Sequence, residues 1–290
     1  MGYKTIFTPV MFEETTRTIL DTALMLAKGF QGHVHAHHIR QRYEYYPPIS
    51  YYPMAVDLPV IASQKQTEAS AAFARTLRSI FDESCDASGA RIVPLAEALN
   101  QSSVTASWRD VEGAVPMDFG RAARIADLSI SILPNENAPA MANAIFESLL
   151  MTSARPVLIV PAQGLATVPE RVLVAWDGSL PAARAVAAAL PFESIAAEVF
   201  VVTVGEEDAG TPSGEAAAAY LRRNGVRASA KTLDGPNRRV ATTLLDQAES
   251  LGCELIVMGG YSHARMYETM LGGVTHHMLG QADRAILLAH

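Results

Sequence analysis

Two short segments in the second half of the chain carry residue types that suit nucleotide binding. One is the acidic turn at Asp177, and the other is a glycine-containing stretch from Gly259 to Gly273. A carboxylate at the end of a strand can accept hydrogen bonds from ribose hydroxyls. Glycine lets the backbone approach a phosphate closely, and the N–H groups at a helix N-terminus attract anions. These residues therefore predict a nucleotide cradle, although glycines that follow a strand can also serve only to make the turn.

The sequence shows no recognisable catalytic constellation. The common phosphate loops, Gly-x4-Gly-Lys-(Ser/Thr) and Gly-x-Gly-x2-Gly, do not occur in it. Ser179 lacks the Gly-x-Ser-x-Gly setting of a hydrolase nucleophile, so we interpret it as the N-cap of a helix that begins at Pro181. Cys85 and Cys253 have no histidine beside them, which argues against a nucleophilic thiol. We therefore expect slow hydrolysis of a bound nucleotide at most.

Three histidines alternate along a predicted strand in the first half of the chain. His33, His35 and His37 would point to one face of the sheet, because side chains of a strand alternate between faces. Three imidazoles on one face could hold Zn²⁺. No cysteine or carboxylate lies at tight ligand spacing beside them, so we assign no metal and favour buried rings that form hydrogen bonds.

A Tyr/Pro-rich insertion at residues 41–59 is the other unusual segment of the first half. It contains Tyr43, Tyr45, Tyr46, Tyr51 and Tyr52. Such an aromatic loop could act as a lid or as a surface for a protein partner. The alternative, which we favour, is that it packs over a crevice of the first half.

The composition excludes several classes of protein. Hydrophobic residues make up 49% of the 290 residues and charged residues 18%, which is too apolar for a disordered chain. No apolar run reaches the ~18 residues of a membrane helix, and no secretory signal is recognisable. The net charge of −7 and the absence of a Lys/Arg run argue against nucleic acid as a partner. With only two cysteines, the sequence predicts a soluble cytoplasmic protein.

Short β-branched runs alternate with Ala/Leu-rich helical patterns along the whole chain, which predicts βαβ units and a parallel sheet. In the first half we expect strands at 4–10, 33–39, 91–95, 127–133 and 156–160. The helices between them are expected at 13–30, 61–88, 115–124 and 138–152. In the second half we expect strands at 171–176, 199–204, 227–232, 255–258 and 285–289. Its helices are expected at 181–190, 213–224, 238–250 and 273–280.

The two halves repeat one another. Residues 4–7 match 171–174, and residues 126–128 match 253–255, so the first copy carries roughly 40 extra residues between its first and fourth strands. We predict one domain at 1–162 and another at 169–290, joined by a Gly/Ala/Pro linker. Each would be a doubly wound, Rossmann-like sheet of five parallel strands, with its ligand crevice at the carboxyl ends of the strands.

Both copies resemble the universal stress protein family, most clearly at residues 172–179 and 255–279. Nucleotide-binding members carry a Gly-x2-Gly-x9-Gly-(Ser/Thr) pattern, which falls here on Gly259, Ser262, Gly272 and Gly273. Two of these positions match. Ser262 stands where the family has glycine, and Gly273 stands where it has the hydroxyl residue that touches the phosphates.

The resemblance implies an ATP site in the second domain. It places Asp177 near the ribose and Ala175 and Val204 beside the adenine. It places Met258 before the phosphate segment and Val274 and Thr275 after it. In the first domain Met11 takes the place of the carboxylate, and no glycine occurs between Gly120 and Gly164, so we expect no nucleotide there.

The family resemblance also implies how the domains pack. The last strands of two family subunits pair antiparallel, so 156–160 and 285–289 would pair within this chain as a pseudo-dimer. The prediction is a tandem universal stress protein that binds ATP or a related adenine nucleotide and has unidentified protein partners. The sequence leaves a further homodimer open. The alternative is a nucleotide-free, chaperone-like interaction module that acts through the pseudo-dimer surface or the Tyr-rich insertion.

Overall fold

The computed structural model describes residues 2–41, 57–98, 103–132, 139–234, 240–260 and 273–290, with the backbone alone for 57–67 and 193. The strands of the first half are β1 (Thr5–Val10), β2 (His33–Gln41), β3 (Arg91–Ile92), β4 (Thr105–Gly113), β5 (Leu128–Ile132) and β6 (Val157–Val160). Its helices are α1 (Glu13–Phe30), α2 (Asp57–Ser88), α3 (Met117–Ala122) and α4 (Ala140–Thr152), with 3-10 turns at Leu95–Glu97 and Ala123–Ile125.

The second half repeats this alternation. Its strands are β7 (Arg171–Ala175), β8 (Glu198–Val204), β9 (Ala228–Leu233), β10 (Leu255–Gly259) and β11 (Ala285–Ala289). Its helices are α5 (Leu180–Glu193), α6 (Gly214–Arg223), α7 (Val240–Ser250) and α8 (Gly273–Gln281). The helices expected at 213–224 and 238–250 end close to those bounds, and each is followed by a glycine with positive φ, Gly225 at 82° and Gly252 at 64°.

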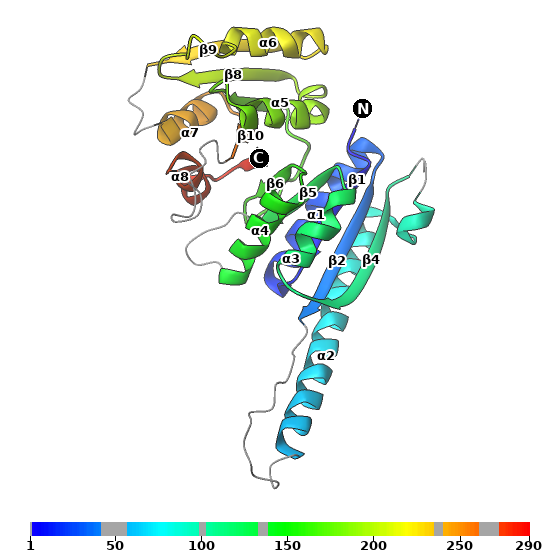
Figure 1. Ribbon diagram of the computed structural model, residues 1–290. Coiled ribbons are helices and arrows are strands. Elements are labelled where there is room, and N and C mark those ends of the chain that lie inside the picture. The colour runs from blue at the N-terminus through cyan, green and yellow to red at the C-terminus, as the bar shows by residue number, and fades with distance from the viewer. Residues whose placement is uncertain (1, 42–56, 99–102, 133–138, 235–239, 261–272) are drawn as a thin grey trace, which may run out of the picture.

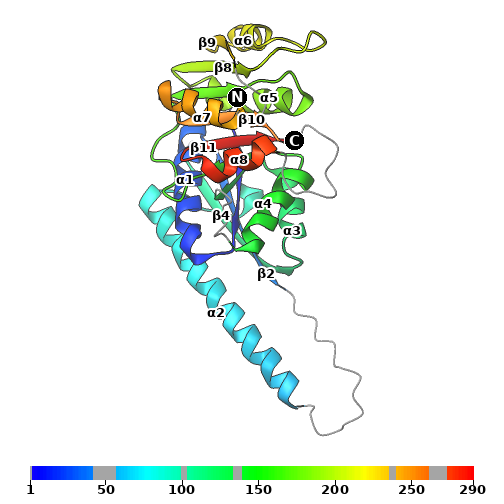
Figure 2. The same ribbon diagram turned by 90° about the vertical axis from the view of Figure 1, so that its left-hand side faces the viewer.

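All strands belong to one sheet of 11 strands in the order β3-β4-β2-β1-β5-β6-β11-β10-β7-β8-β9 (Figures 1 and 2). Within each half every strand pair is parallel, and the two halves meet where β6 pairs antiparallel with β11. At this junction Leu158 lies opposite Leu287. The expected pairing of the two last strands is therefore confirmed, and so is the tandem doubly wound fold.

The described residues of the first half contain six strands rather than the predicted five. The strand expected at 91–95 shrinks to the two residues of β3, because Pro94 removes a backbone donor there. The place beside β2 belongs to β4, a strand that the prediction missed. In the second half the corresponding place is filled by β9, so that half keeps the five-strand order.

Apolar side chains cover both faces of the sheet. Helices α1, α2, α5 and α6 pack on one face, and α3, α4, α7 and α8 pack on the other. The inner strands are buried on both sides, which is why they are continuous runs of Val, Ile and Leu. This burial makes the strand ends, rather than the strand faces, the place where polar chemistry can reach solvent.

Helix α2 runs well past the carboxyl edge of the sheet (Figures 1 and 2). Its 32 residues span about 48 Å at ~1.5 Å per residue, whereas the nine residues of β2 span about 30 Å. Among the residues of α2 whose side chains are described, Ala74 is the first that is buried. Phe73, just before it, leaves 39% of its surface exposed.

An aromatic cluster joins the two halves away from the strand junction. The rings of Tyr3 and Phe30 come from the first half, and the ring of Phe192 comes from the end of α5. Their centroids lie 5.2–5.4 Å apart in edge-on or tilted pairs. The Tyr3 hydroxyl donates a hydrogen bond to the Ala188 carbonyl at 2.6 Å. The segment between β6 and β7 also contacts α1, since Thr22 Oγ1 accepts from the Leu165 amide at 3.2 Å.

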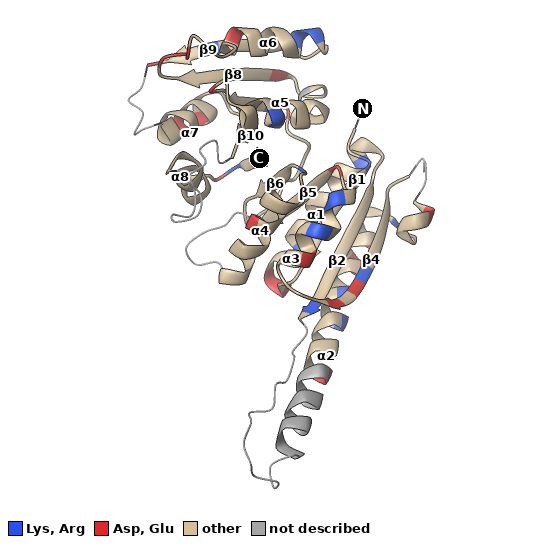
Figure 3. Ribbon diagram, in the orientation of Figure 1, with Lys and Arg blue, Asp and Glu red and all other residues tan. Residues whose placement is uncertain are grey.

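Charges of both signs are interspersed along the helices and strands of both halves (Figure 3). The ion pairs of the described residues are mostly exposed, and an example is Arg171 with Glu198 at 2.7 Å. Within the described ranges, no helix combines the length and the apolar character that a membrane span requires.

Candidate functional site

The carboxyl end of β7 forms a tight polar turn. Asp177 is exposed, and its Oδ1 accepts a hydrogen bond from the Ser179 amide at 3.0 Å. The Ser179 hydroxyl accepts from the Ala182 amide at 3.3 Å, which confirms that this serine is the N-cap of α5. Gly178 has φ of 73°, and a methyl group on it would lie 2.3 Å from Thr211 Oγ1. The turn therefore needs glycine at 178 and uses one of the two Asp177 oxygens.

Gly259, at the end of β10, has a packing role that the sequence pattern does not show. A methyl group on its Cα would lie 2.5 Å from the Ala182 nitrogen and 2.7 Å from the Pro181 carbonyl carbon. Because both of these are backbone atoms, they cannot rotate away as a side chain can. The glycine lets the first turn of α5 pack directly against the end of β10.

Replacing Gly259 with alanine is expected to destabilise the protein by about 2 kcal/mol, because α5 must move away from β10. The loss should appear in urea or thermal unfolding without any nucleotide. A matched control is Gly280→Ala on α8, where an added methyl group meets no atom within 4 Å. An unchanged unfolding midpoint for Gly259→Ala would show that the close contact is absent.

The other predicted positions are distributed around the ends of β7, β8 and β10. Met258 lies opposite Ala175 in the sheet, and Met258 is 5% exposed within the apolar cluster. Ala175 and Val204, the two residues predicted beside the adenine, are half-buried against the same cluster and share one face of the sheet with Met258. Ser262 and Gly272 lie outside the described residues.

The start of α8 is open to a ligand. Gly273 is the first helical residue and is exposed, and an added methyl group would meet no atom within 4 Å. Val274 is half-buried, and Thr275 is buried with 5% of its surface exposed. The N–H groups of this first turn carry the positive end of the helix dipole. Among the described residues, none occupies the space beside Gly273 that an anionic group would need.

The geometry of the second half matches a ligand crevice of a doubly wound sheet. β7 lies between β8 and β10, and the chain winds outward in opposite directions from these two neighbours. Ligands of such sheets bind outside the carboxyl ends of the strands at this switch point. Asp177 Oδ2 has no hydrogen bond from a described residue and could accept from hydroxyl groups there. The described residues thus offer a carboxylate, an apolar strip and an open helix N-terminus.

The corresponding edge of the first half is different. The strand pairing shifts the repeat alignment of β1 by one residue, because Leu128 lies opposite Ile6 and its counterpart Leu255 lies opposite Val172. Met11 therefore corresponds to Asp177; it directly follows β1 and packs half-buried against the apolar cluster, so this position has no carboxylate. Residues 133–138, which follow β5, lie outside the described residues, and so does most of the Tyr-rich insertion. The expectation that this half binds no nucleotide stays a prediction.

The histidine row lies on one face of β2, as predicted, and faces polar residues of β4. His33 Nδ1 lies 2.8 Å from Thr105 Oγ1, and His33 Nε2 lies 2.8 Å from Ser107 Oγ. The same Ser107 hydroxyl lies 2.9 Å from His35 Nδ1. Because each neutral ring has one donor and one acceptor, hydroxyls and imidazoles alternate in a directional chain. The interpretation of hydrogen-bonded rings is confirmed for His33 and His35.

His37 differs from the other two rings. Its Nδ1 is buried and has no hydrogen-bond partner among the described residues, and its ring packs against Phe7 and Phe119 at 5.7 and 6.1 Å. Burial and the nearby His35, Arg109 and His38 lower the pKa of His37 to about 3, and Asp118 opposes them only partly.

Burial also lowers the pKa of His33 and of His35 to about 4. The neighbouring ring of His35 adds to this effect at His33, and the Arg109 guanidinium adds to it at His35. The whole row is therefore neutral at pH 7. Among the residues that the structure describes, no group of three or more His, Cys, Asp or Glu side chains is placed to hold a metal ion.

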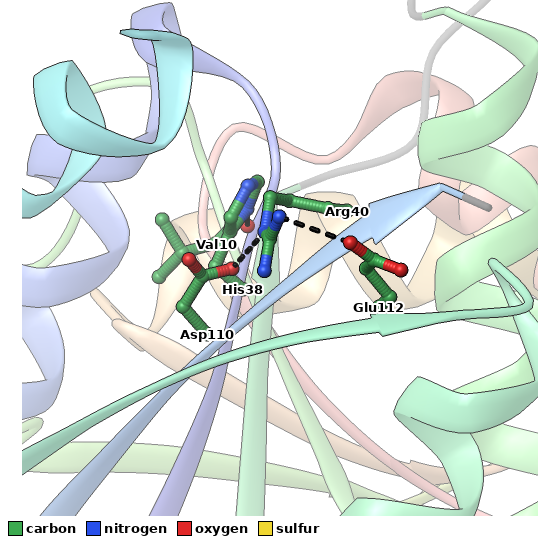
Figure 4. Close-up of polar contacts among 5 residues, drawn as sticks. All are labelled: Val10, His38, Arg40, Asp110 and Glu112. Carbon is green, nitrogen blue, oxygen red and sulfur yellow. Dashed lines mark hydrogen bonds and ion pairs between the residues drawn. The ribbon is translucent and has the colours of Figure 1, made fainter. Parts of the chain in front are cut away.

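A polar cluster at the ends of β2 and β4 was not predicted (Figure 4). Arg40 reaches both Asp110 Oδ1, at 3.0 Å, and Glu112 Oε1, at 3.2 Å. His38 Nδ1 donates to the Val10 carbonyl at 2.8 Å, and the ring stacks on Trp108. The signal was present in the sequence, since Trp108, Asp110 and Glu112 alternate with the period of a strand.

Both cysteines are buried in the protein interior. Burial raises the pKa of Cys85 to about 12 and that of Cys253 to about 11. Both groups therefore stay thiols at neutral pH, and neither presents a thiolate for reaction.

The fold is that of universal stress proteins. A universal stress protein from Archaeoglobus fulgidus superposes with a TM-score of 0.69 at 14% identity, covering 98% of this chain and 97% of that one. A candidate universal stress protein from Pseudomonas aeruginosa gives 0.56 at 13% identity, covering 99% and 93%. A protein of unknown function from the same species gives 0.56 at 12% identity, covering 99% and 92%. No protein-family model and no curated protein sequence matches the chain.

Proposed function

We propose that this chain is a tandem universal stress protein of the cytoplasm, with domains at 1–162 and 169–290, and that its second domain binds ATP or a related adenine nucleotide. The observation that carries the proposal is the exposed carboxylate of Asp177 at the switch point of a domain whose helix α8 begins at an exposed glycine, Gly273. The N-terminal N–H groups suit phosphates, and the carboxylate suits a ribose.

The residues around this crevice fit such a ligand. Asp177 would hold the ribose hydroxyls, and Ala175, Val204 and Met258 would contact the base. The phosphates would lie along the segment from Gly259 to Gly273, including Ser262 and Gly272. Val274 and Thr275 would complete the first turn of α8 behind them. The sequence shows no recognisable catalytic constellation, so occupancy rather than turnover is the proposed signal.

The decisive experiment measures ATP binding to the purified protein and to Asp177→Ala. We expect millimolar ATP to raise the melting temperature of the wild type. Asp177→Ala should weaken binding about tenfold, since it removes a charged acceptor for hydroxyls. Asp234→Ala, which removes a carboxylate just after β9, is the matched control and should bind as the wild type does. No melting shift at millimolar ATP would exclude the proposal.

A nucleotide-free interaction module is the second candidate. It is favoured by α2, which extends beyond the sheet and leaves Phe73 39% exposed beside the His38 ring. Deleting residues 43–52, between β2 and α2, should then remove bound partners from a pull-down without affecting ATP binding. An unchanged set of partners would exclude this segment as the interaction surface.

A further inference from the structure

Trp176 is the first residue after β7 and stands directly before Asp177. Its ring is 8% exposed and lies in the apolar cluster that also contains residues of α5 and α6. Its amide donates to the Val202 carbonyl of β8 at 2.9 Å, and its indole N–H donates to the Pro212 carbonyl at 2.8 Å. A tryptophan can fill an apolar cluster and still carry a donor. Trp176 therefore ties the chain just before Asp177 to β8 and to the segment that follows β8.

The segment at residues 205–213, which joins β8 to α6, is held by hydrogen bonds of its own. Glu207 Oε1 accepts from the Gly214 amide at 2.8 Å, so this carboxylate closes the segment and caps the start of α6. Inside the segment, the amide and the hydroxyl of Thr211 both donate to the Asp208 carbonyl, at 3.0 and 3.1 Å. The indole therefore bonds to a part of the segment whose backbone position is already set.

Asp177 is restrained from both sides along the chain. On its far side, the Ser179 amide donates to Asp177 Oδ1 at 3.0 Å, which holds the carboxylate relative to the start of α5. On its near side, Trp176 holds it relative to β8, because the amide and the indole of Trp176 bond to β8 and to the segment after it. A ligand that contacts both Asp177 and the end of β8 needs the second restraint, since that restraint sets how the two groups lie at the carboxyl edge of the sheet.

We infer that Trp176 is a positioning residue for the Asp177 carboxylate, and that it acts through the hydrogen bond from its indole to the Pro212 carbonyl. The inference rests on the proposed function for its effect on nucleotide affinity, because Asp177 is proposed to hold the ribose and Val204 to contact the base. Its structural part, the restraint of Asp177 from the side of β8, does not depend on a nucleotide. Loss of the indole N–H should therefore weaken binding, although it removes no group that is proposed to contact the ligand.

The test uses the full chain and two matched pairs of variants. Trp176→Phe removes the indole donor and keeps an aromatic ring in the cluster, whereas Trp108→Phe makes the same change on β4 of the first half. Glu207→Ala removes the carboxylate that closes the segment, whereas Glu206→Ala removes the same charge from the exposed residue beside it. If the negative charge of the segment mattered rather than its hydrogen bonds, the two glutamate variants would behave alike.

Two measurements are compared, hydrogen exchange of the Ser179 amide without ligand and the Kd for ATP. Trp176→Phe and Glu207→Ala are each expected to speed the exchange and to raise Kd by about fivefold. The two control variants should stay within about twofold of the wild type in both measurements. The Val174 amide, inside β7, is the internal reference and should exchange at its wild-type rate, because general destabilisation would speed its exchange as well.

Three outcomes would overturn the inference: wild-type exchange and Kd in Trp176→Phe, equal effects of the two glutamate variants, or equal acceleration of exchange at Val174. If the wild type binds no ATP, the proposed function fails. The exchange of the Ser179 amide then still decides whether Trp176 positions Asp177.

Discussion

Acidification from pH 7 to pH 5 is expected to destabilise the first half of the protein by several kcal/mol. The buried rings of His33, His35 and His37 have pKa values near 4, 4 and 3 in the folded state, against 6.5 for an ordinary histidine. The unfolded chain therefore takes up protons below pH 6.5 while the folded chain does not. Stability is fully present above pH 6.5 and declines as the pH falls toward 4.

The size of this effect follows from the pKa differences. Each ring costs about 1–2 kcal/mol at pH 5, after allowance for coupling between neighbouring rings. The four groups that face His37 are His35, His38, Arg109 and Asp118, and only the carboxylate favours its protonation. Urea unfolding at several pH values between 7.5 and 5 measures directly how the free energy of unfolding changes with pH.

His37→Leu separates this explanation from general acid sensitivity. The ring nitrogen that it removes has no hydrogen-bond partner, so the variant should be about 1 kcal/mol more stable at pH 7. On acidification it should also lose less stability than the wild type, because it lacks one of the three buried rings that take up a proton on unfolding. His276→Gln, at an exposed position on α8, should leave the slope unchanged. If the free energy of unfolding of His37→Leu depended on pH as strongly as that of the wild type, the low pKa assigned to His37 would be contradicted.

Removal of the Tyr3 side chain is the second large effect that we expect. Tyr3→Ala loses the contacts with Phe30 and Phe192 and the hydrogen bond to the Ala188 carbonyl. Truncation of a buried aromatic ring costs about 3–5 kcal/mol. Because this ring joins the two halves, the variant should also separate unfolding into two transitions.

Tyr3→Phe keeps the ring and removes only the hydroxyl, and we expect a loss of about 1 kcal/mol with a single transition. Tyr220→Ala provides the surface control, because 41% of that side chain is exposed on α6, and it should change stability by less than about 0.5 kcal/mol. Scanning calorimetry resolves both the loss and the number of transitions. A single transition for Tyr3→Ala, at the wild-type temperature, would show that the cluster does not join the halves.

The fold was predictable because its inner strands are buried on both faces and its helix ends carry clear signals. Val157–Val160 and Ala285–Ala289 consist of aliphatic residues and alanine, and Gly225 and Gly252 end helices as expected. β4 escaped prediction because it lies near the edge of the sheet, where strands carry charges and half-exposed residues. The more apolar segment at 91–95 resembled a strand better, although Pro94 limits it to two residues.

The binding roles of the candidate site stay a prediction, and the structure reports only where its described residues lie. Asp177 and Gly273 are exposed at the strand and helix ends where the pattern put them. The pattern of glycines could not show that Gly259 is required by α5, because this contact joins segments far apart in the chain.

The β6–β11 junction joins two domains of one polypeptide, whereas two separate subunits would have to meet by collision to form the same pairing. In a symmetric dimer of identical chains, each substitution appears in both subunits at once. In this chain the two halves can change independently. Met11 and Asp177 illustrate this freedom, since they stand at corresponding strand ends and differ completely in chemistry. Covalent linkage also makes the pairing independent of protein concentration, so the contact between the halves persists at any dilution.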